Sequence, residues 1–190
     1  MTLLRLYSTG MKRFMIILFL LLSYQFSEGQ PLRDINTYLK NPAIPKVAKL
    51  YYAGKFRASD DDSTFRIIDS LKTNNDRTRP FYILLTTKMR IHLNDEALSE
   101  VLSLASEELF EENPNALIEF LYCKNPLVKK EFKESWVSGI LGEIYMSHEK
   151  EEQKYLGTLK IKTFKKCKPE NKKSLESFYT MLNKEMRNIH

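Results

Sequence analysis

The sequence is poor in the residues from which common active-site motifs are built. Its 190 residues include three histidines, two cysteines and six glycines. No histidine lies in a His-Glu-x-x-His pattern or at zinc-binding spacing from a cysteine. The chain also lacks a phosphate-binding loop, a dinucleotide-binding glycine motif and a Gly-x-Ser-x-Gly turn. No local motif therefore indicates a zinc enzyme or a nucleotide-binding enzyme, and we expect no cofactor.

The sequence also lacks an apolar run long enough for an ordinary membrane-spanning helix. Its longest run, Phe14–Leu22, follows two cations, Lys12 and Arg13. A helix that crosses a bilayer needs roughly 20 apolar residues, and this run has about half of that. The pattern is typical of a signal peptide. The alternative is an uncleaved anchor that extends through Tyr24 and Phe26, followed by a polar flank.

Small side chains mark a cleavage site after the apolar run. Ser27 and Gly29 occupy the minus-three and minus-one positions before Gln30, as a signal peptidase requires. We therefore predict a signal peptide over 1–29, with a start that lies at Met11 or earlier. No cysteine stands near this site to carry a lipid. The predicted mature chain is exported, either secreted or periplasmic, and has no transmembrane helix.

The composition of the chain is that of one ordinary globular domain. Hydrophobic residues make up 43% and charged residues 28%, so wholesale disorder is not expected. The formal net charge is +6, and the predicted signal segment contributes +2 of it, which leaves +4. This mild charge favours attraction to anionic surfaces, and nucleic acid is not an expected partner. We predict an irregular N-terminal arm at 30–45 and a single helical domain at 46–190.

Helical periodicity dominates the predicted domain. Apolar residues recur every three or four positions in most segments, which favours amphipathic helices. Three Asn-Pro pairs, which begin at Asn41, Asn113 and Asn125, fit helix starts, because proline is tolerated in the first turn. We predict an all-α fold, either an irregular bundle or a short solenoid, of about eight antiparallel helices. Its helix at 81–93, apolar on most faces, is expected to be central.

One helix end carries an unusual concentration of acids. Glu107, Glu108, Glu111 and Glu112 lie where the helix dipole is already negative, and the pairs four residues apart repel each other. Seven lysines lie between 160 and 173 with one intervening acid. We therefore hypothesise that this basic segment folds back toward the acidic helix end. The alternative is two solvated faces that never meet.

The catalytic and metal-binding candidates are few. Glu143 lies in an apolar helix, and His148 follows the same apolar stripe, so these are the candidates for acid–base chemistry. The four glutamates of the acidic helix end are the candidates for a divalent cation. Two carboxyl groups could also cleave a polysaccharide if one of them lay in an apolar pocket.

The remaining candidates concern structure and surface contact. Cys123 and Cys167 could pair in an oxidising compartment, or Cys123 could be a small core residue at a helix end. A set of lysines could contact an anionic envelope component: Lys160, Lys162, Lys165, Lys166 and Lys168. The sequence thus favours an exported binding or assembly module of the cell envelope, with an unidentified protein or an anionic component as partner. The alternative is a small helical hydrolase that acts on an envelope or polysaccharide substrate.

Overall fold

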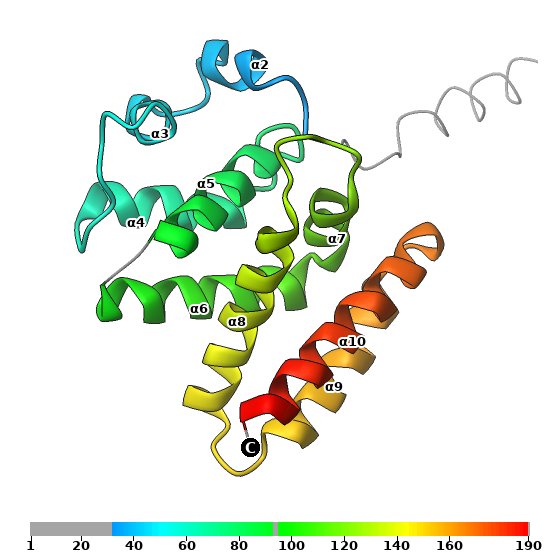
Figure 1. Ribbon diagram of the computed structural model, residues 1–190. Coiled ribbons are helices and arrows are strands. Elements are labelled where there is room, and N and C mark those ends of the chain that lie inside the picture. Colours follow the sequence, from blue (N-terminus) through cyan, green and yellow to red (C-terminus); the bar gives the residue numbers. More distant parts are fainter. Residues whose placement is uncertain (1–31, 93–94, 190) are drawn as a thin grey trace, which may run out of the picture.

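The computed structural model describes residues 32–92 and 95–189, and every regular element within these ranges is helical (Figure 1). The elements are α2 (Ile35–Lys40), α3 (Lys46–Tyr52), α4 (Asp62–Asp69), the 3-10 turn η1 (Ser70–Lys72), α5 (Arg79–His92), α6 (Glu96–Glu112), α7 (Pro114–Tyr122), α8 (Lys130–Ser147), α9 (Glu152–Lys166), the 3-10 turn η2 (Pro169–Asn171) and α10 (Lys172–Ile189). The all-α prediction is confirmed, and the elements form a bundle. The predicted signal peptide at 1–29 lies outside the described residues.

Side-chain caps begin α4, α6 and α7, and the cap of α7 is the Asn-Pro start at Asn113 that the sequence predicts. The Oδ1 atom of Asp61 accepts hydrogen bonds from the amides of Ser63 and Thr64, at 2.7 and 3.0 Å. Asp95 caps α6 in the same way, and Asn113 accepts from the Ala116 amide at the start of α7. These bonds satisfy amides that have no partner within the helix.

The other two Asn-Pro pairs do not start helices. The Oδ1 atoms of Asn41 and Asn125 accept from the amide two residues ahead, at 2.9 Å in both cases, which closes an Asx-turn. The Oδ1 atom of Asn113 accepts instead from the amide three residues ahead, and the chain after it is helical. The long helix α8 therefore begins at Lys130 and not directly after Pro126.

The core surrounds α5, whose residues are buried on nearly every face, as the sequence predicts. Trp136 of α8 is fully buried, and its indole N–H donates to the Thr87 hydroxyl at 2.7 Å. Thr87 in turn donates to the carbonyl of Ile83. This buried polar pair is satisfied, so it fixes the position of α8 on α5 without leaving an unpaired group.

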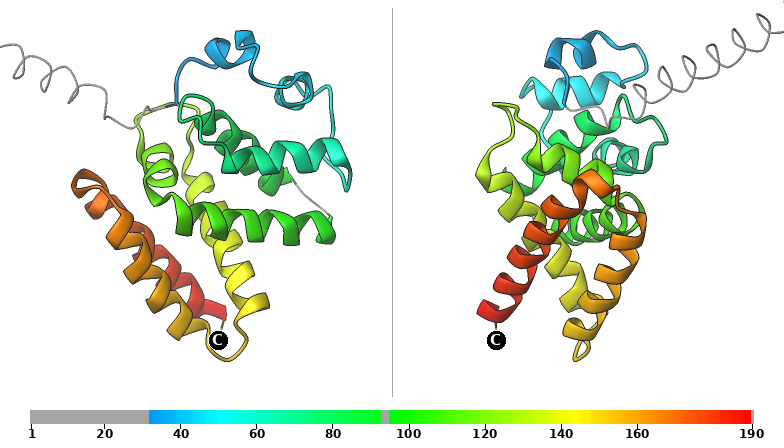
Figure 2. Two further views of the ribbon diagram at one scale, coloured as in Figure 1. Left: turned by 180° about the vertical axis from the view of Figure 1, so that it is seen from behind. Right: turned by 90° about the vertical axis from the view of Figure 1, so that its right-hand side faces the viewer.

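The helices are arranged with α2 and α3 at one end of the molecule and the far ends of α9 and α10 at the other (Figures 1 and 2). The most extensive helix–helix contact joins α6 and α8. α9 packs on α6 and α8, whereas α10 packs mainly on α8. The right-hand view of Figure 2 shows α9 and α10 separating as they leave their common turn at η2.

The N-terminal arm contains one helix that is anchored in the core. Tyr38 of α2 is 2% exposed, and its ring stacks on Phe81 of α5 with ring centroids 5.2 Å apart. Stacked aromatic pairs of this kind add to the free energy gained from burial. The arm is therefore attached to the helical body through α2.

Two glycines inside α8 allow close approach of neighbouring side chains. A Cβ atom at Gly139 would overlap the guanidinium of Arg90, and one at Gly142 would lie 3.2 Å from the Ser103 hydroxyl. The close neighbours at these two positions are therefore side chains of α5 and α6. None of the described helices combines the length and the apolar character needed to cross a membrane.

Candidate functional site

The four glutamates at the end of α6 point to different partners. Glu108 Oε2 lies 2.7 Å from Lys72 Nζ, and Glu111 Oε1 lies 2.8 Å from Lys162 Nζ. Glu112 is exposed. In the described ranges no three His, Cys, Asp or Glu side chains are grouped as metal ligands. The predicted candidates for a cation site are therefore not brought together as one.

Glu107 differs from its neighbours because it is buried. It is 8% exposed, and its Oε1 atom accepts a hydrogen bond of 2.6 Å from the Tyr155 hydroxyl. Burial raises the pKa of Glu107, the Tyr155 hydrogen bond opposes this, and the negative charges of Glu111 and Glu143 raise it again. Burial and the bond to Glu107 raise the pKa of Tyr155, which keeps the phenol protonated as the donor.

The two catalytic candidates of α8 lie close to this pair. The His148 ring, just beyond the end of α8, stacks on Tyr155 with ring centroids 3.5 Å apart. Glu143 accepts a hydrogen bond from Ser147 one turn ahead. Glu107 and His148 thus both contact Tyr155, which no sequence pattern marked, and Glu143 lies near enough to raise the pKa of Glu107. The packing of α9 on α6 and α8 sets the position of Tyr155.

The basic segment folds back onto the acidic helix end, which confirms the fold-back hypothesis. Lys162 pairs with Glu111, and Lys166 Nζ donates to the main-chain carbonyl of Glu111 at 2.8 Å. The latter contact places a cation at the negative end of the α6 dipole. Glu108 has Lys72 as its partner.

Internal partners also occupy other lysines that were predicted to contact an anionic component. Lys160 pairs with Glu176 at 2.8 Å, and Lys168 pairs with Glu119 at 2.9 Å. Lys165 is exposed and forms no ion pair with the described residues. An anionic surface that bound this segment would compete with these internal contacts.

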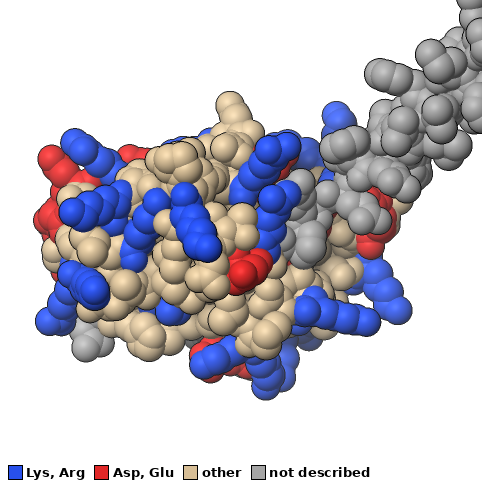
Figure 3. All heavy atoms as spheres, turned by 90° about the horizontal axis from the view of Figure 1, so that it is seen from above, with Lys and Arg blue, Asp and Glu red and all other residues tan. Residues whose placement is uncertain are grey.

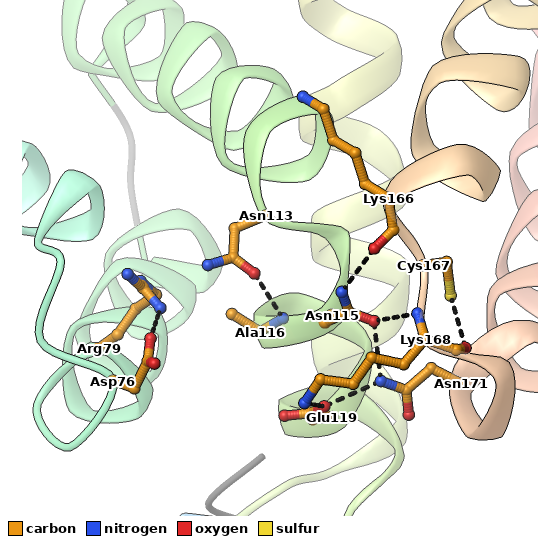
Figure 4. Close-up of polar contacts among 10 residues, drawn as sticks. All are labelled: Asp76, Arg79, Asn113, Asn115, Ala116, Glu119, Lys166, Cys167, Lys168 and Asn171. Atoms are coloured by element: carbon orange, nitrogen blue, oxygen red, sulfur yellow. Dashed lines mark hydrogen bonds and ion pairs between the residues drawn. The ribbon is translucent and has the colours of Figure 1, made fainter. Parts of the chain in front are cut away.

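Asn115 joins the start of α7 to the link between α9 and α10 (Figure 4). Its Nδ2 donates to the Lys166 carbonyl at 2.9 Å, and its Oδ1 accepts from the Lys168 amide at 2.8 Å. The Asn171 side chain donates to the same Oδ1 and also to Glu119. This network fixes the turn that orients the α9–α10 pair.

The two cysteines are free, so the disulfide that the sequence allowed is not formed in the structure. Cys167 follows α9 beside Lys166 and Lys168, which contact Asn115 at the start of α7. Cys123 lies eight residues after Asn115, at the other end of α7. The eight residues from Asn115 to Cys123 rise about 12 Å along the α7 axis at 1.5 Å per residue, so the two cysteines lie near opposite ends of this helix. Burial raises the pKa of both thiols.

A groove of about 780 Å³ lies between the end of α3 and the end of α5. The end of α3 shapes one wall. Gly54 has φ of +70°, its amide donates to the Tyr51 carbonyl, and the Lys55 amide donates to the Leu50 carbonyl. This is a Schellman motif, in which glycine is the residue that accepts the left-handed conformation.

The loop that follows α3 and forms this wall is also held by hydrogen bonds where α4 begins. Asp61 Oδ2 accepts from the Ser59 hydroxyl at 2.5 Å, and the Ser59 amide donates to the Thr64 hydroxyl at 3.1 Å. The Ser59 bond and the amide caps of the helix lower the pKa of Asp61, so the cap is charged at neutral pH. The loop that carries Phe56 and Arg57 is therefore held at both ends.

The groove combines aromatic rings with cations. Its lining includes Tyr51, Tyr52, Phe56, Arg57, Lys88, Met89, His92 and Asp95. Lys88 Nζ lies 4.7 Å from the centre of the Tyr52 ring, a cation–π distance. Burial raises the pKa of Tyr51 to about 12, so its hydroxyl stays neutral.

The groove was missed in the sequence because Tyr51 forms part of a helical stripe and is readily assigned to the core. The signal that could have found it is the density of aromatic residues around Gly54, a helix-ending glycine. No protein-family model, curated protein or solved structure matches the chain. Its function is therefore argued from its own residues.

Proposed function

We propose that the protein is a binding module whose groove between α3 and α5 captures a segment of a partner protein. The observation that carries the proposal is the groove itself, with its three aromatic rings and about 780 Å³ of space. Binding sites in proteins are typically of this size, largely apolar, and carry a few polar groups that orient the ligand. Tyrosine is well suited to such a site, because its large ring offers contact area at low entropic cost.

The charges of the groove favour an acidic and apolar segment. Arg57 and Lys88 contribute two cations and Asp95 one anion, and His92 adds a further nitrogen donor. An acidic side chain in the ligand could pair with Arg57 or Lys88 while an apolar side chain packs on the rings. The proposal includes the setting that the sequence predicts, an exported protein that assembles with an envelope component.

Peptide binding tests this proposal directly. Two pools of short fluorescent peptides, one mixing Asp and Glu with Phe and Leu and the other mixing Lys and Arg with the same apolar residues, are titrated with the protein. We expect the acidic pool to bind and the basic pool to bind much less. Lys88→Glu should abolish this preference, because it places a negative charge beside the Tyr52 ring.

Lys184→Glu is the matched control, since Lys184 is an exposed residue of α10. It makes the same change in net charge away from the groove and should keep the preference. Equal binding of the two pools, or an unaltered preference in Lys88→Glu, would refute the groove as the binding site.

A hydrolase is the second candidate, and the buried Glu107 is the observation that favours it. A carboxyl whose pKa is raised by burial is suited to act as a general acid, and Glu143 would be the second carboxyl. The groove contains neither residue. Release of reducing sugars from cell-wall polysaccharide, lost in both Glu107→Gln and Glu143→Gln, would support this alternative over the binding module.

A further inference from the structure

Four exposed lysines at the α2–α3 end of the molecule have no acidic partner among residues 32–92 and 95–189. Lys40 ends α2, Lys46 begins α3, Lys55 follows α3, and Lys124 lies in the loop between α7 and α8. None of them forms an ion pair with the described residues. We call these four residues the basic face. Figure 3, which views this end from above, shows Lys and Arg side chains spread across the surface and outnumbering Asp and Glu.

The segments that carry the basic face are tied together. The Asn125 side chain donates to the Leu32 carbonyl at 2.9 Å, which joins the α7–α8 loop to the entry of α2. The buried Tyr38 fixes α2 on α5. The elements that carry these lysines, α2, α3 and the α7–α8 loop, lie at the same end of the molecule (Figure 1).

Few acids offset this charge. Between residues 32 and 58 the chain carries six cations and one acid, Asp34. Asp34 caps α2, with its Oδ1 accepting from the Asn36 amide at 3.2 Å. Because the lysines of the basic face form no ion pair within the part of the chain that the structure describes, an external anion could bind them without breaking one there.

We propose that the basic face docks the protein onto a lipid bilayer that contains anionic lipid. The cations come from three segments at one end of the molecule, and a bilayer is a broad charged surface that several of them can meet together. Leu127, 37% exposed in the same loop as Lys124, offers an apolar side chain at the edge of that surface. Each basic residue near an anionic leaflet strengthens binding, and the effect falls off within a Debye length.

This surface is distinct from the lysine segment at 160–168. There, Lys160, Lys162 and Lys168 already bind acids of the same chain. The basic face is also distinct from the groove, because Lys40, Lys46 and Lys124 do not line it. Membrane docking and ligand capture can therefore be tested separately.

The test is sedimentation of the full chain with vesicles. One set contains phosphatidylglycerol in phosphatidylcholine, and the other contains phosphatidylcholine alone. The protein is compared with the triple variant Lys40→Gln/Lys46→Gln/Lys124→Gln. We expect the variant to lose binding to anionic vesicles by roughly fivefold for each cation removed. The binding should also weaken as salt is raised.

The matched control is Lys165→Gln/Lys173→Gln/Lys184→Gln, three exposed lysines of α9 and α10 that form no ion pair with the described residues. It removes the same charge and should retain most of the binding. Binding common to both vesicle types is assigned to the apolar run Phe14–Leu22 and subtracted. Lys88→Glu should still bind vesicles while losing peptide selectivity, which separates this proposal from the groove.

Three results would overturn the proposal. The first is equal loss in the triple variant and its control. The second is equal binding to neutral and anionic vesicles by the unmodified chain. The third is failure to bind vesicles together with salt-sensitive binding to an acidic polysaccharide, which would assign the basic face to that polymer.

Discussion

Two segments of this molecule have nearly the same charge and use it differently. Residues 33–57 contain six cations and one acid, and residues 160–173 contain seven cations and one acid. The second segment folds onto the acidic end of α6 and onto α7, where several of its lysines gain partners. In the first segment Lys40, Lys46 and Lys55 are exposed and form no ion pair with the described residues, and Lys49 donates to the Asn41 carbonyl. A run of cations therefore indicates a binding surface only where the fold leaves it without partners.

The largest expected effect is on the free energy of unfolding. It comes from Asn115, whose hydrogen bonds hold the second segment at Lys166 and Lys168. Asn115→Ala removes three hydrogen bonds that join α7 to the α9–α10 link. We expect a loss of about 2 kcal/mol in the free energy of unfolding, measured by urea denaturation. Asn36→Ala, an exposed site in α2, should change it by less than about 0.5 kcal/mol. Equal losses would mean that the link is not held more tightly than the basic arm.

A smaller effect is expected from the pH dependence of Glu107. Burial raises its pKa in the folded state, so the folded chain binds this proton more strongly than the unfolded chain. Its contribution to stability is therefore present at low pH and is lost as pH rises from the ordinary carboxyl range through the folded pKa. Glu107→Gln should flatten that part of the curve, because the amide oxygen can still accept from Tyr155.

Stability curves against pH for the unmodified chain and Glu107→Gln provide the measurement. Glu100→Gln, at an exposed position of α6 that forms no ion pair with the described residues, serves as the control. If Glu107→Gln keeps the original slope above the ordinary carboxyl range, the burial of this carboxyl does not govern the pH response.

The smallest effect concerns the choice of partner at the acidic helix end. Glu108 pairs with Lys72 of η1 and not with the basic segment. A double-mutant cycle of Lys72→Met and Glu108→Gln should give a coupling of about 0.5 kcal/mol, since both side chains are partly exposed. The same cycle with Lys166→Met in place of Lys72→Met should be additive. Stronger coupling to Lys166 would contradict the arrangement of the two segments.

Much of the fold could be predicted because its signals are local. Asp95 and Asn113 precede apolar stripes and cap the helices that follow. Asn125 carries the same Asn-Pro signal but closes a turn. An Asn-Pro pair starts a helix when the Asn side chain accepts from the third amide ahead, and closes a turn when it accepts from the second. The hydrogen bond from Asn125 to Leu32, far away in the sequence, holds Asn125 in the turn.

The candidate sites depend on contacts between distant helices, and this limits their prediction. Glu107 and His148 were identified singly, yet Tyr155 joins them only because α9 packs on α6 and α8. The groove has the same origin, since Tyr52 and Lys88 come from different helices. The charge pairing at the end of α6 was predictable because an excess of like charge demands compensation somewhere in the chain.

The contact between Arg90 and Gly139 constrains how this sequence can change. The guanidinium lies on the glycine, its Nε donates to the Ser135 carbonyl, and burial lowers its pKa to about 10. A larger residue at 139 would displace a cation that has little free volume around it. In any lineage that descends from this chain, the two positions are expected to mutate together, with a bulkier residue on one helix matched by a shorter one on the other.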